Sequence, residues 1–216
     1  MSQQKVIGVL AGGDMPPEIL RPWLAWADII FAADGGALHV LEAGFEPTAI
    51  IGDMDSLSRH HWPENIPIHE DPNQDTTDVD KVLLHAERAG HRRVTLLGTE
   101  GDLMDHTLSA FSSALRSSLD VRFALRRTMA YLVTEGQTLL VSTVPGRRVS
   151  LIPIGMAHGV DLSGVKWPLA GHDLKFGGLV SISNESTEHE VRAQVRAGVA
   201  TLFIERSMEE IPDWHL

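Results

Sequence analysis

Three short apolar runs near the N-terminus each lead into a turn that contains glycine and aspartate. The runs, each with the turn that follows it, span residues 6–14, 29–36 and 49–56. Apolar runs of this length, bounded by turn residues, are typical of buried strands. In open parallel sheets the ligand lies beyond the carboxyl ends of the strands, which is where these three turns stand. The pattern predicts an α/β domain with a ligand site at the glycine and aspartate turns.

The third turn carries two carboxylates in an Asp-x-Asp arrangement, at Asp53 and Asp55. Alternate residues of an extended segment share a face, so both side chains can point at one object. Two adjacent carboxylates repel each other, and a divalent cation removes that repulsion. Mg²⁺ is usually held by one or two carboxylates together with the phosphates of a substrate. The pair predicts a Mg²⁺–phosphate site, and the alternative is a turn with two solvated aspartates.

The composition restricts the kinds of partner. Eighteen basic and 29 acidic residues give the 216-residue chain a formal net charge of −11. A protein that binds nucleic acid shows a clustered basic face, so this balance argues against such a partner. The absence of cysteine excludes disulfides, thiolate zinc sites and a cysteine nucleophile. We find neither a signal-peptide pattern nor an apolar stretch of bilayer length, which predicts a cytoplasmic protein without a membrane partner.

A second polar segment precedes a predicted helix near residue 78. Thr77 is a candidate N-cap, with Asp80 three residues later in a capping-box arrangement. Asp78 and Lys81 are i, i+3 neighbours and therefore share a face of the helix. Simple capping with one surface ion pair is the alternative explanation. A later helix opens near Asp105, where a carboxylate also suits the helix dipole.

The pattern of apolar and turn residues changes after about residue 128. Short β-prone runs alternate with turn residues, and helical periodicity disappears; the runs are 131–134, 139–143, 149–154, 179–182, 191–195 and 200–205. Several short strands at this spacing are typical of a sandwich or a barrel. We therefore expect two domains, at residues 1–127 and 128–216.

Blocks of this sequence, taken in order, resemble the thiamine pyrophosphokinase family. They are residues 33–37, 47–56, 74–81 and 105–106, with residues 164–169 and 182–185 resembling the C-terminal part of that family. The resemblance implies a Rossmann-like α/β domain that binds ATP and a C-terminal β-sandwich domain that contributes to thiamine binding and dimerisation. It implies a homodimer with thiamine in clefts between subunits. The implied reaction moves the terminal pyrophosphoryl unit of ATP onto the thiamine hydroxyl, giving thiamine diphosphate and AMP.

The resemblance also implies a role for individual positions. Mg²⁺ would be held by Asp53, Asp55 and Asp78. The catalytic group would comprise these three residues with Lys81 and Asp105. ATP would be bound by Asp34, Gly35, Gln74, Asp75, Thr77 and His106. Thiamine would contact Ser183, Asn184 and Trp167.

The chain departs from the family pattern at two positions. Leu103 stands where an arginine is expected, and Ala110 stands where an asparagine is usual. A guanidinium is a forked, always-charged donor that leucine cannot replace. Three other arginines are candidates for its role, namely Arg92, Arg93 and Arg116.

Phosphoryl-type transfer requires positioning and charge neutralisation more than covalent chemistry from the protein. In our hypothesis Lys81 is a point cation beside the phosphates, and Asp78 or Asp105 accepts the hydroxyl proton. Two alternatives stay open. Leu103 favours a catalytically weak thiamine or nucleotide sensor of the same fold, and the Asp-x-Asp pair also occurs in glycosyltransferases that use nucleotide sugars.

Overall fold

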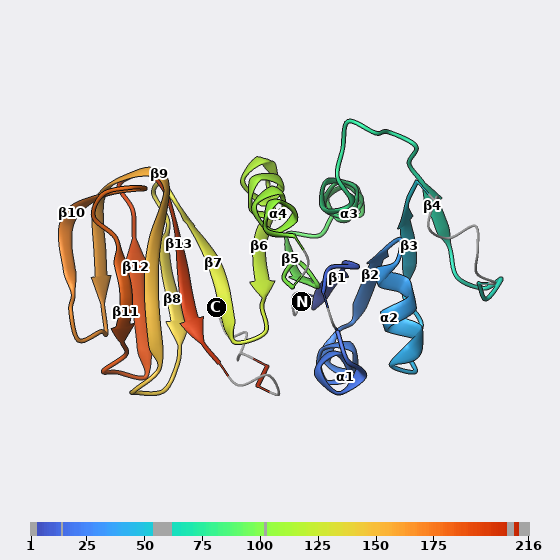
Figure 1. Ribbon diagram of the computed structural model, residues 1–216, viewed down its shortest axis with the longest axis horizontal. Helices are drawn as coiled ribbons and strands as arrows, with labels where there is room; N and C mark the ends of the chain where they lie inside the picture. The colour runs from blue at the N-terminus through green and yellow to red at the C-terminus, as the bar shows by residue number, and fades with distance from the viewer. Residues whose placement is uncertain (1–3, 14, 54–61, 102, 207–209, 212–216) are drawn as a thin grey trace. The chain divides into compact units, whose positions relative to one another are not determined.

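The computed structural model describes residues 4–13, 15–53, 62–101, 103–206 and 210–211. The chain divides into two compact units, Met1–Arg126 and Arg127–Leu216 (Figure 1). The first unit combines helices with a parallel sheet, and the second contains strands only in its described part.

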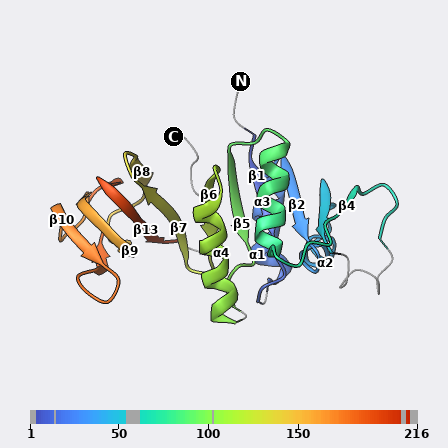
Figure 2. The same ribbon diagram turned by 90° about the horizontal axis from the view of Figure 1, so that it is seen from above.

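The first unit is built on six parallel strands in the spatial order β4-β3-β2-β1-β5-β6. In chain order its elements are β1 (Val6–Val9), α1 (Pro17–Trp26), β2 (Ile29–Ala33), α2 (Gly36–Glu42), β3 (Ala49–Gly52), β4 (Ile68–Glu70), α3 (Asp78–Arg88), β5 (Arg93–Leu97), α4 (Met104–Arg116) and β6 (Asp120–Ala124). Helices α3 and α4 pack together on one face of the sheet, and α1 and α2 pack on the other (Figure 2). The chain leaves β1 and β5 in opposite directions, so the gap between these two strands is the switch point where ligands bind in such sheets.

Local sequence explains most of these elements. All four residues of β1 and of β3 are buried, as expected for strands covered by helices on both faces. Helix α1 begins after Pro16 with Pro17 in its first turn, where the missing proline N–H is not needed. The apolar face of α3 is buried and includes Val79, Val82, Leu83 and Ala86.

The second unit is antiparallel and is organised around one long strand. Its strands are β7 (Thr128–Thr134), β8 (Thr138–Ser142), β9 (Arg148–Ser163), β10 (Leu169–Lys175), β11 (Ser181–Glu185), β12 (Glu190–Gln194) and β13 (Ala197–Glu205). Strand β13 pairs with β9 on both sides of its middle, whereas β11 pairs with the first half of β9 and β10 and β12 pair with its last part. Between the two halves Gly155 has a φ of +79°, and the register with β13 shifts there. A glycine at such a position lets the strand bend and change partners.

Three strand predictions were incomplete, and each has a physical reason. Strands β4 and β10 were missed because their side chains are mostly exposed, so they show no alternation of apolar and polar residues. Strand β9 continues nine residues beyond the predicted end at Ile154, because the glycine that reads as a turn is a bend within the strand. Among the described helices, none is long and apolar enough to cross a bilayer.

Candidate functional site

A cavity of about 390 Å³ opens at the carboxyl edge of the parallel sheet. Its walls come from the segments after β1, β3 and β5, from the start of α3 and from α4. The lining residues are Leu10, Ala11, Gly12, Asp53, Thr76, Thr77, Asp78, Val79, Lys81, Gly98, Thr99, His106, Ser109 and Ala110. The cavity therefore lies at the switch point between β1 and β5, where the topology of the sheet predicts a ligand.

Two glycines allow the wall between β1 and β5 to be main chain. A Cβ on Gly12 would lie 2.3 Å from the carbonyl oxygen of Gly98, and a Cβ on Gly98 would lie 2.3 Å from that of Leu10. Gly98 also has a φ of +72°, which side chains rarely adopt. The two loops thus pack backbone against backbone, and a ligand can approach their peptide groups without obstruction.

Asp53 and Lys81 form an ion pair on the cavity wall. Lys81 Nζ lies 3.4 Å from Asp53 Oδ2, and Gln74 Nε2 donates to the same oxygen at 3.1 Å. The Lys81 side chain is only 2% exposed, so its charge is desolvated and depends on nearby carboxylates. The structure thus brings together Asp53, Gln74 and Lys81.

Asp78 lies in the first turn of α3 and faces the same cavity. Burial raises the pKa of Asp78, and the nearby charge of Asp53 acts in the same direction. Lys81 and His106 oppose that rise in pKa, which shows that these groups lie close to one another. Two carboxylates and one cation, drawn from two elements, therefore meet at one place.

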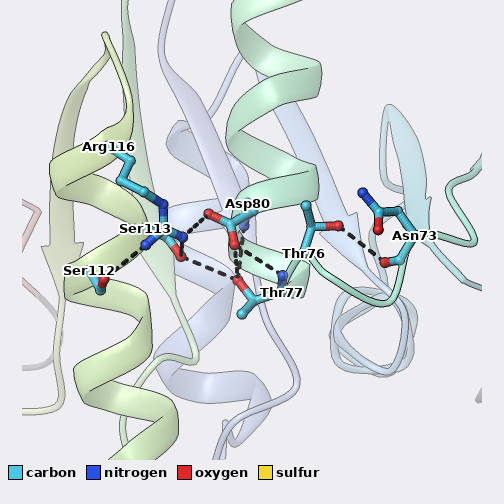
Figure 3. A network of polar contacts seen from close by, with 7 residues as sticks. All are labelled: Asn73, Thr76, Thr77, Asp80, Ser112, Ser113 and Arg116. Atoms are coloured by element: carbon cyan, nitrogen blue, oxygen red, sulfur yellow. Dashed lines mark hydrogen bonds and ion pairs between the residues drawn. The ribbon is translucent and has the colours of Figure 1, made fainter.

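The start of α3 is held by a capping box that extends to α4 (Figure 3). Thr77 Oγ1 accepts the N–H of Asp80 at 3.2 Å, and Asp80 Oδ2 accepts the N–H of Thr77 at 3.0 Å. This confirms the predicted capping arrangement. Burial acts to raise the pKa of Asp80, but hydrogen bonds from Thr77, Ser113 and Arg116 outweigh it and hold that pKa below its usual range.

Several residues expected at the site lie elsewhere. Asp75 lines a neighbouring cavity of about 470 Å³ between α3 and α4, which shares Thr76 and Lys81 with the first. Asp105 is exposed, and its carboxylate accepts the N–H of His106 at 3.0 Å. Asp34 is buried beneath Gly52, where a Cβ would meet Asp34 Oδ1 at 2.2 Å.

Gly35 packs against Ala11 behind the cavity wall, since a Cβ there would lie 3.2 Å from the Ala11 side chain. Asp55 lies outside the described residues. Within the described part of the chain, no group of three or more His, Asp or Glu side chains is arranged to hold a metal ion.

The residues expected to contact thiamine cluster within the second unit. The buried Asn184 side chain accepts the N–H of Trp167 at 3.1 Å and donates to the Trp167 carbonyl at 2.8 Å. Asn184 thus fixes the backbone of Trp167, a residue that is 57% exposed. Ser183 has a φ of +58°, and its N–H donates to Ser150 Oγ at 3.1 Å.

None of the three candidate arginines lines the cavity, and sequence reasoning missed a fourth candidate. Arg116 bonds to Asp80, and Arg93 pairs with Asp120 at the start of β6. Arg126 lies at the other end of β6, where its backbone N–H donates to Glu100 Oε2 at 2.8 Å. Its guanidinium occupies the space that a Cβ on Gly101 would enter, with Nη2 at 2.5 Å. No local pattern marks Arg126, because its position depends on the pairing of β5 with β6.

Sequence reasoning also missed Thr99 and Ser109 on the cavity wall. Ser109 follows His106 by three residues on α4, so helical spacing was a usable signal. Thr99 follows the glycine at the end of β5, and its carbonyl accepts the hydroxyl of Thr107 at 2.9 Å.

A parallel sheet with glycine loops, carboxylates and a buried lysine at its carboxyl edge defines an α/β protein that binds a phosphate-bearing ligand. The comparisons with known proteins identify the family. Residues 20–124 match the model "Thiamin pyrophosphokinase, catalytic domain", and residues 137–200 match "Thiamin pyrophosphokinase, vitamin B1 binding domain". The two matches together span most of the chain, and the chain belongs to the thiamin pyrophosphokinase family.

Individual relatives agree with this assignment. Thiamine pyrophosphokinase 2 of Arabidopsis thaliana is 29% identical over 74% of this chain and 73% of its own length. Thiamine pyrophosphokinase of Bacillus subtilis is 25% identical over 84% of this chain and 89% of its own length. A crystal structure of thiamine pyrophosphokinase from Bacillus subtilis superposes with a TM-score of 0.79 at 22% identity, covering 93% of this chain and 99% of that one. The resemblance inferred from the sequence blocks is confirmed.

Proposed function

We propose that this protein is a thiamine pyrophosphokinase that transfers the terminal pyrophosphoryl unit of ATP to the hydroxyl of thiamine. The products are thiamine diphosphate and AMP. The observation that carries the proposal is the presence, in one chain and in order, of a catalytic and a vitamin B1 binding family segment. In the first of these segments lies the cavity with its carboxylates and buried lysine.

The polyphosphate is bound at the carboxyl edge of the sheet. The glycine loops after β1 and β5 expose main chain to the cavity, and the first turn of α3 directs its N–H groups and its positive dipole end toward the same space. Lys81 supplies a side-chain cation. These groups place the phosphates beside Asp53 and Asp78.

In the transfer step the thiamine hydroxyl oxygen bonds to the β-phosphorus of ATP. The bond from that phosphorus to the oxygen bridging to the α-phosphate breaks, and the electron pair leaves with AMP. Asp78 accepts the hydroxyl proton, since its carboxylate faces the cavity and has a second oxygen besides the one that would bind Mg²⁺. Asp105 is less suited to this role, because it is exposed and bonds to its own helix.

Mg²⁺ suits this site on the chemistry of its donors. Asp53 and Asp78 lie close enough for the charge of one to raise the pKa of the other, and such a pair is relieved by a divalent cation. We propose that Asp53, Asp55 and Asp78 hold the ion. When bound it neutralises the charge on the phosphates.

The antiparallel unit is proposed to be a β-sandwich that contributes to thiamine binding and to a homodimer. Most of its exposed large apolar side chains belong to β9 and to the segment around β10 and β11, and these are Ile154, Met156, Trp167, Phe176, Leu179 and Ile182. A second copy would cover such a surface, with thiamine near Trp167 and Ser183. Because the reaction consumes ATP, we place the protein in the cytoplasm.

The test is incubation with ATP, Mg²⁺ and thiamine, followed by separation of AMP, ADP and the thiamine phosphates. We expect equal amounts of AMP and thiamine diphosphate. Formation of ADP with thiamine monophosphate would contradict pyrophosphoryl transfer. Tight ATP binding without AMP would instead support the sensor, for which the exposed Leu103 is the motivating observation. A parallel incubation with nucleotide sugars tests the glycosyltransferase alternative.

A further inference from the structure

Arg116 lies near the C-terminal end of α4 and reaches across to the start of α3 (Figure 3). Its Nη2 donates to Asp80 Oδ1 at 2.7 Å and to Ser113 Oγ at 3.2 Å. Its Nη1 donates to Ser112 Oγ at 2.9 Å. One hydrogen bond of the guanidinium therefore reaches Asp80 on α3, and the other two hold it against its own helix.

Asp80 uses its two oxygens for different partners. Oδ2 accepts the N–H and the hydroxyl of Thr77 at 3.0 and 2.9 Å, which closes the capping box. Oδ1 accepts the hydrogen bond from Arg116. Thr77 Oγ1 also lies 3.2 Å from Ser113 Oγ, so α4 contacts the cap at two points.

The same helical turn carries the groups that face the candidate active site. Asp78 and Lys81 flank Asp80 in sequence, and both line the cavity that contains Asp53. Arg116 lines the neighbouring cavity between α3 and α4 and is not among the residues of the active-site cavity. Lys81 lines both cavities, and the hydrogen bond of Arg116 to α3 is the one to Asp80. We therefore expect Arg116 to act on the reaction through Asp80 and the cap.

We propose that Arg116 is a positioning residue for the transfer reaction, which fixes the first turn of α3 through Asp80 so that Asp78 and Lys81 keep their geometry beside Asp53. The proposal rests on the proposed function of the cavity. Small displacements of aligned groups are costly, since a shift of about 1 Å can lower a rate by about 100-fold.

The chain offers a matched control at the other end of the same helix. Glu87 Oε1 accepts the N–H of Ser118 at 2.9 Å and also the Ser118 hydroxyl, so Glu87 ties α3 to the segment after α4. Glu87 lies seven residues after Asp80, which is about 10 Å along the helix axis. Both ties join α3 to the end of α4, but only the first lies on the turn that faces the active site.

The experiment compares Arg116→Gln, Arg116→Lys and Glu87→Gln with the wild type. Melting temperature, kcat, KM for each substrate and the Mg²⁺ concentration for half-maximal rate are measured well below the lowest melting temperature. We expect Arg116→Gln to lower kcat by about tenfold or more and to shift the Mg²⁺ dependence. Arg116→Lys should recover part of the rate, since lysine offers a charge without the forked donor.

Glu87→Gln should leave kcat and the Mg²⁺ dependence within about twofold of wild type, even if it lowers the melting temperature as much as Arg116→Gln does. Equal kcat losses in Arg116→Gln and Glu87→Gln, or no loss in Arg116→Gln, would overturn the positioning role. The wild-type assay separates the two proposals, because absence of thiamine diphosphate there refutes the function itself. In that case the affinity of the same variants for Mg·ATP tests the positioning role of Arg116, and an unchanged affinity in Arg116→Gln would contradict that role.

Discussion

Neutralising Asp53 while Lys81 stays in place should destabilise the first unit markedly. Nζ and Oδ2 lie 3.4 Å apart, and the side chains of Lys81 and Asp53 are 2% and 20% exposed. Two unit charges at that separation attract by about 5 kcal/mol at an effective dielectric constant of 20. Removing one member of a buried pair costs about 3–5 kcal/mol. Because Asp78 also lies near Lys81 and Asp53 reaches solvent, we expect Asp53→Asn to cost about 2–3 kcal/mol of unfolding free energy.

Removing the Lys81 charge while Asp53 stays in place should cost less unfolding free energy. Lys81→Met keeps an unbranched side chain in the buried position and leaves the Asp53 carboxylate, which can hydrate. We expect a loss of about 1–2 kcal/mol, because the partly exposed carboxylate still lies close to Asp78. The double variant Asp53→Asn/Lys81→Met removes both charges and should lie within about 1 kcal/mol of wild type. Turnover should fall by about 100-fold or more in all three, because the charges aimed at the phosphates are gone.

The assay combines urea unfolding with AMP formation. Tryptophan fluorescence follows unfolding, and Trp23 is fully buried in the first unit. The control is Arg93→Gln, which breaks a more exposed pair with Asp120 and should cost less than about 1 kcal/mol without affecting turnover. If the double variant is no more stable than Asp53→Asn alone, the buried charge of Lys81 does not depend on the Asp53 carboxylate, and the reasoning is refuted.

Three further predictions concern other parts of the first unit. Gly52→Ala should lower stability by about 2 kcal/mol or more, seen as a lower melting temperature, because its Cβ would meet the buried Asp34 carboxylate at 2.2 Å. Burial lowers the pKa of His85 in the folded protein. As the pH falls below about 6.5, this histidine therefore takes up a proton more readily in the unfolded chain than in the folded one. Stability should therefore decrease from pH 7.5 to 5.5, and His85→Gln should make that decrease smaller. The titratable and charged groups near His85 are His69, Arg88 and His91. Arg126→Ala should raise the KM for ATP by about tenfold, and Leu103→Arg in that background should recover part of it, whereas an unchanged KM would exclude a phosphate contact for Arg126.

The parts of the fold that sequence predicted are those set by local patterns. The capping box of Thr77 and Asp80 needs only four consecutive residues. A strand that is buried on both faces appears in the sequence as a continuous apolar run. Strand β10 is an exposed strand without alternation, so nothing local distinguishes it from a loop. The bend in β9 at Gly155 follows from pairing with strands on both sides, which is tertiary information.

The candidate site divides in the same way. Asp53 and Asp78 could be predicted to meet, because parallel strands place their carboxyl ends at one edge of the sheet. The exposure of Asp105 depends on how α4 is rotated, and its place in the sequence carries no signal for that rotation. Arg126 reaches Gly101 only because β6 lies beside β5, so sequence reasoning considered Arg92, Arg93 and Arg116 in its place.

The charges around the cavity imply a steep dependence on the metal ion. Lys81 bonds to Asp53 and Arg116 bonds to Asp80, so these two cations already have carboxylate partners before a polyphosphate arrives. The glycine loops and the start of α3 contribute dipoles but no full charge. In a chain of net charge −11, most of the neutralisation must then come from Mg²⁺ that binds with the nucleotide. We therefore expect turnover to rise with Mg²⁺ up to and beyond the ATP concentration and to stop in excess EDTA. Undiminished AMP formation in EDTA would show that the acids after β3 serve some purpose other than seating a cation.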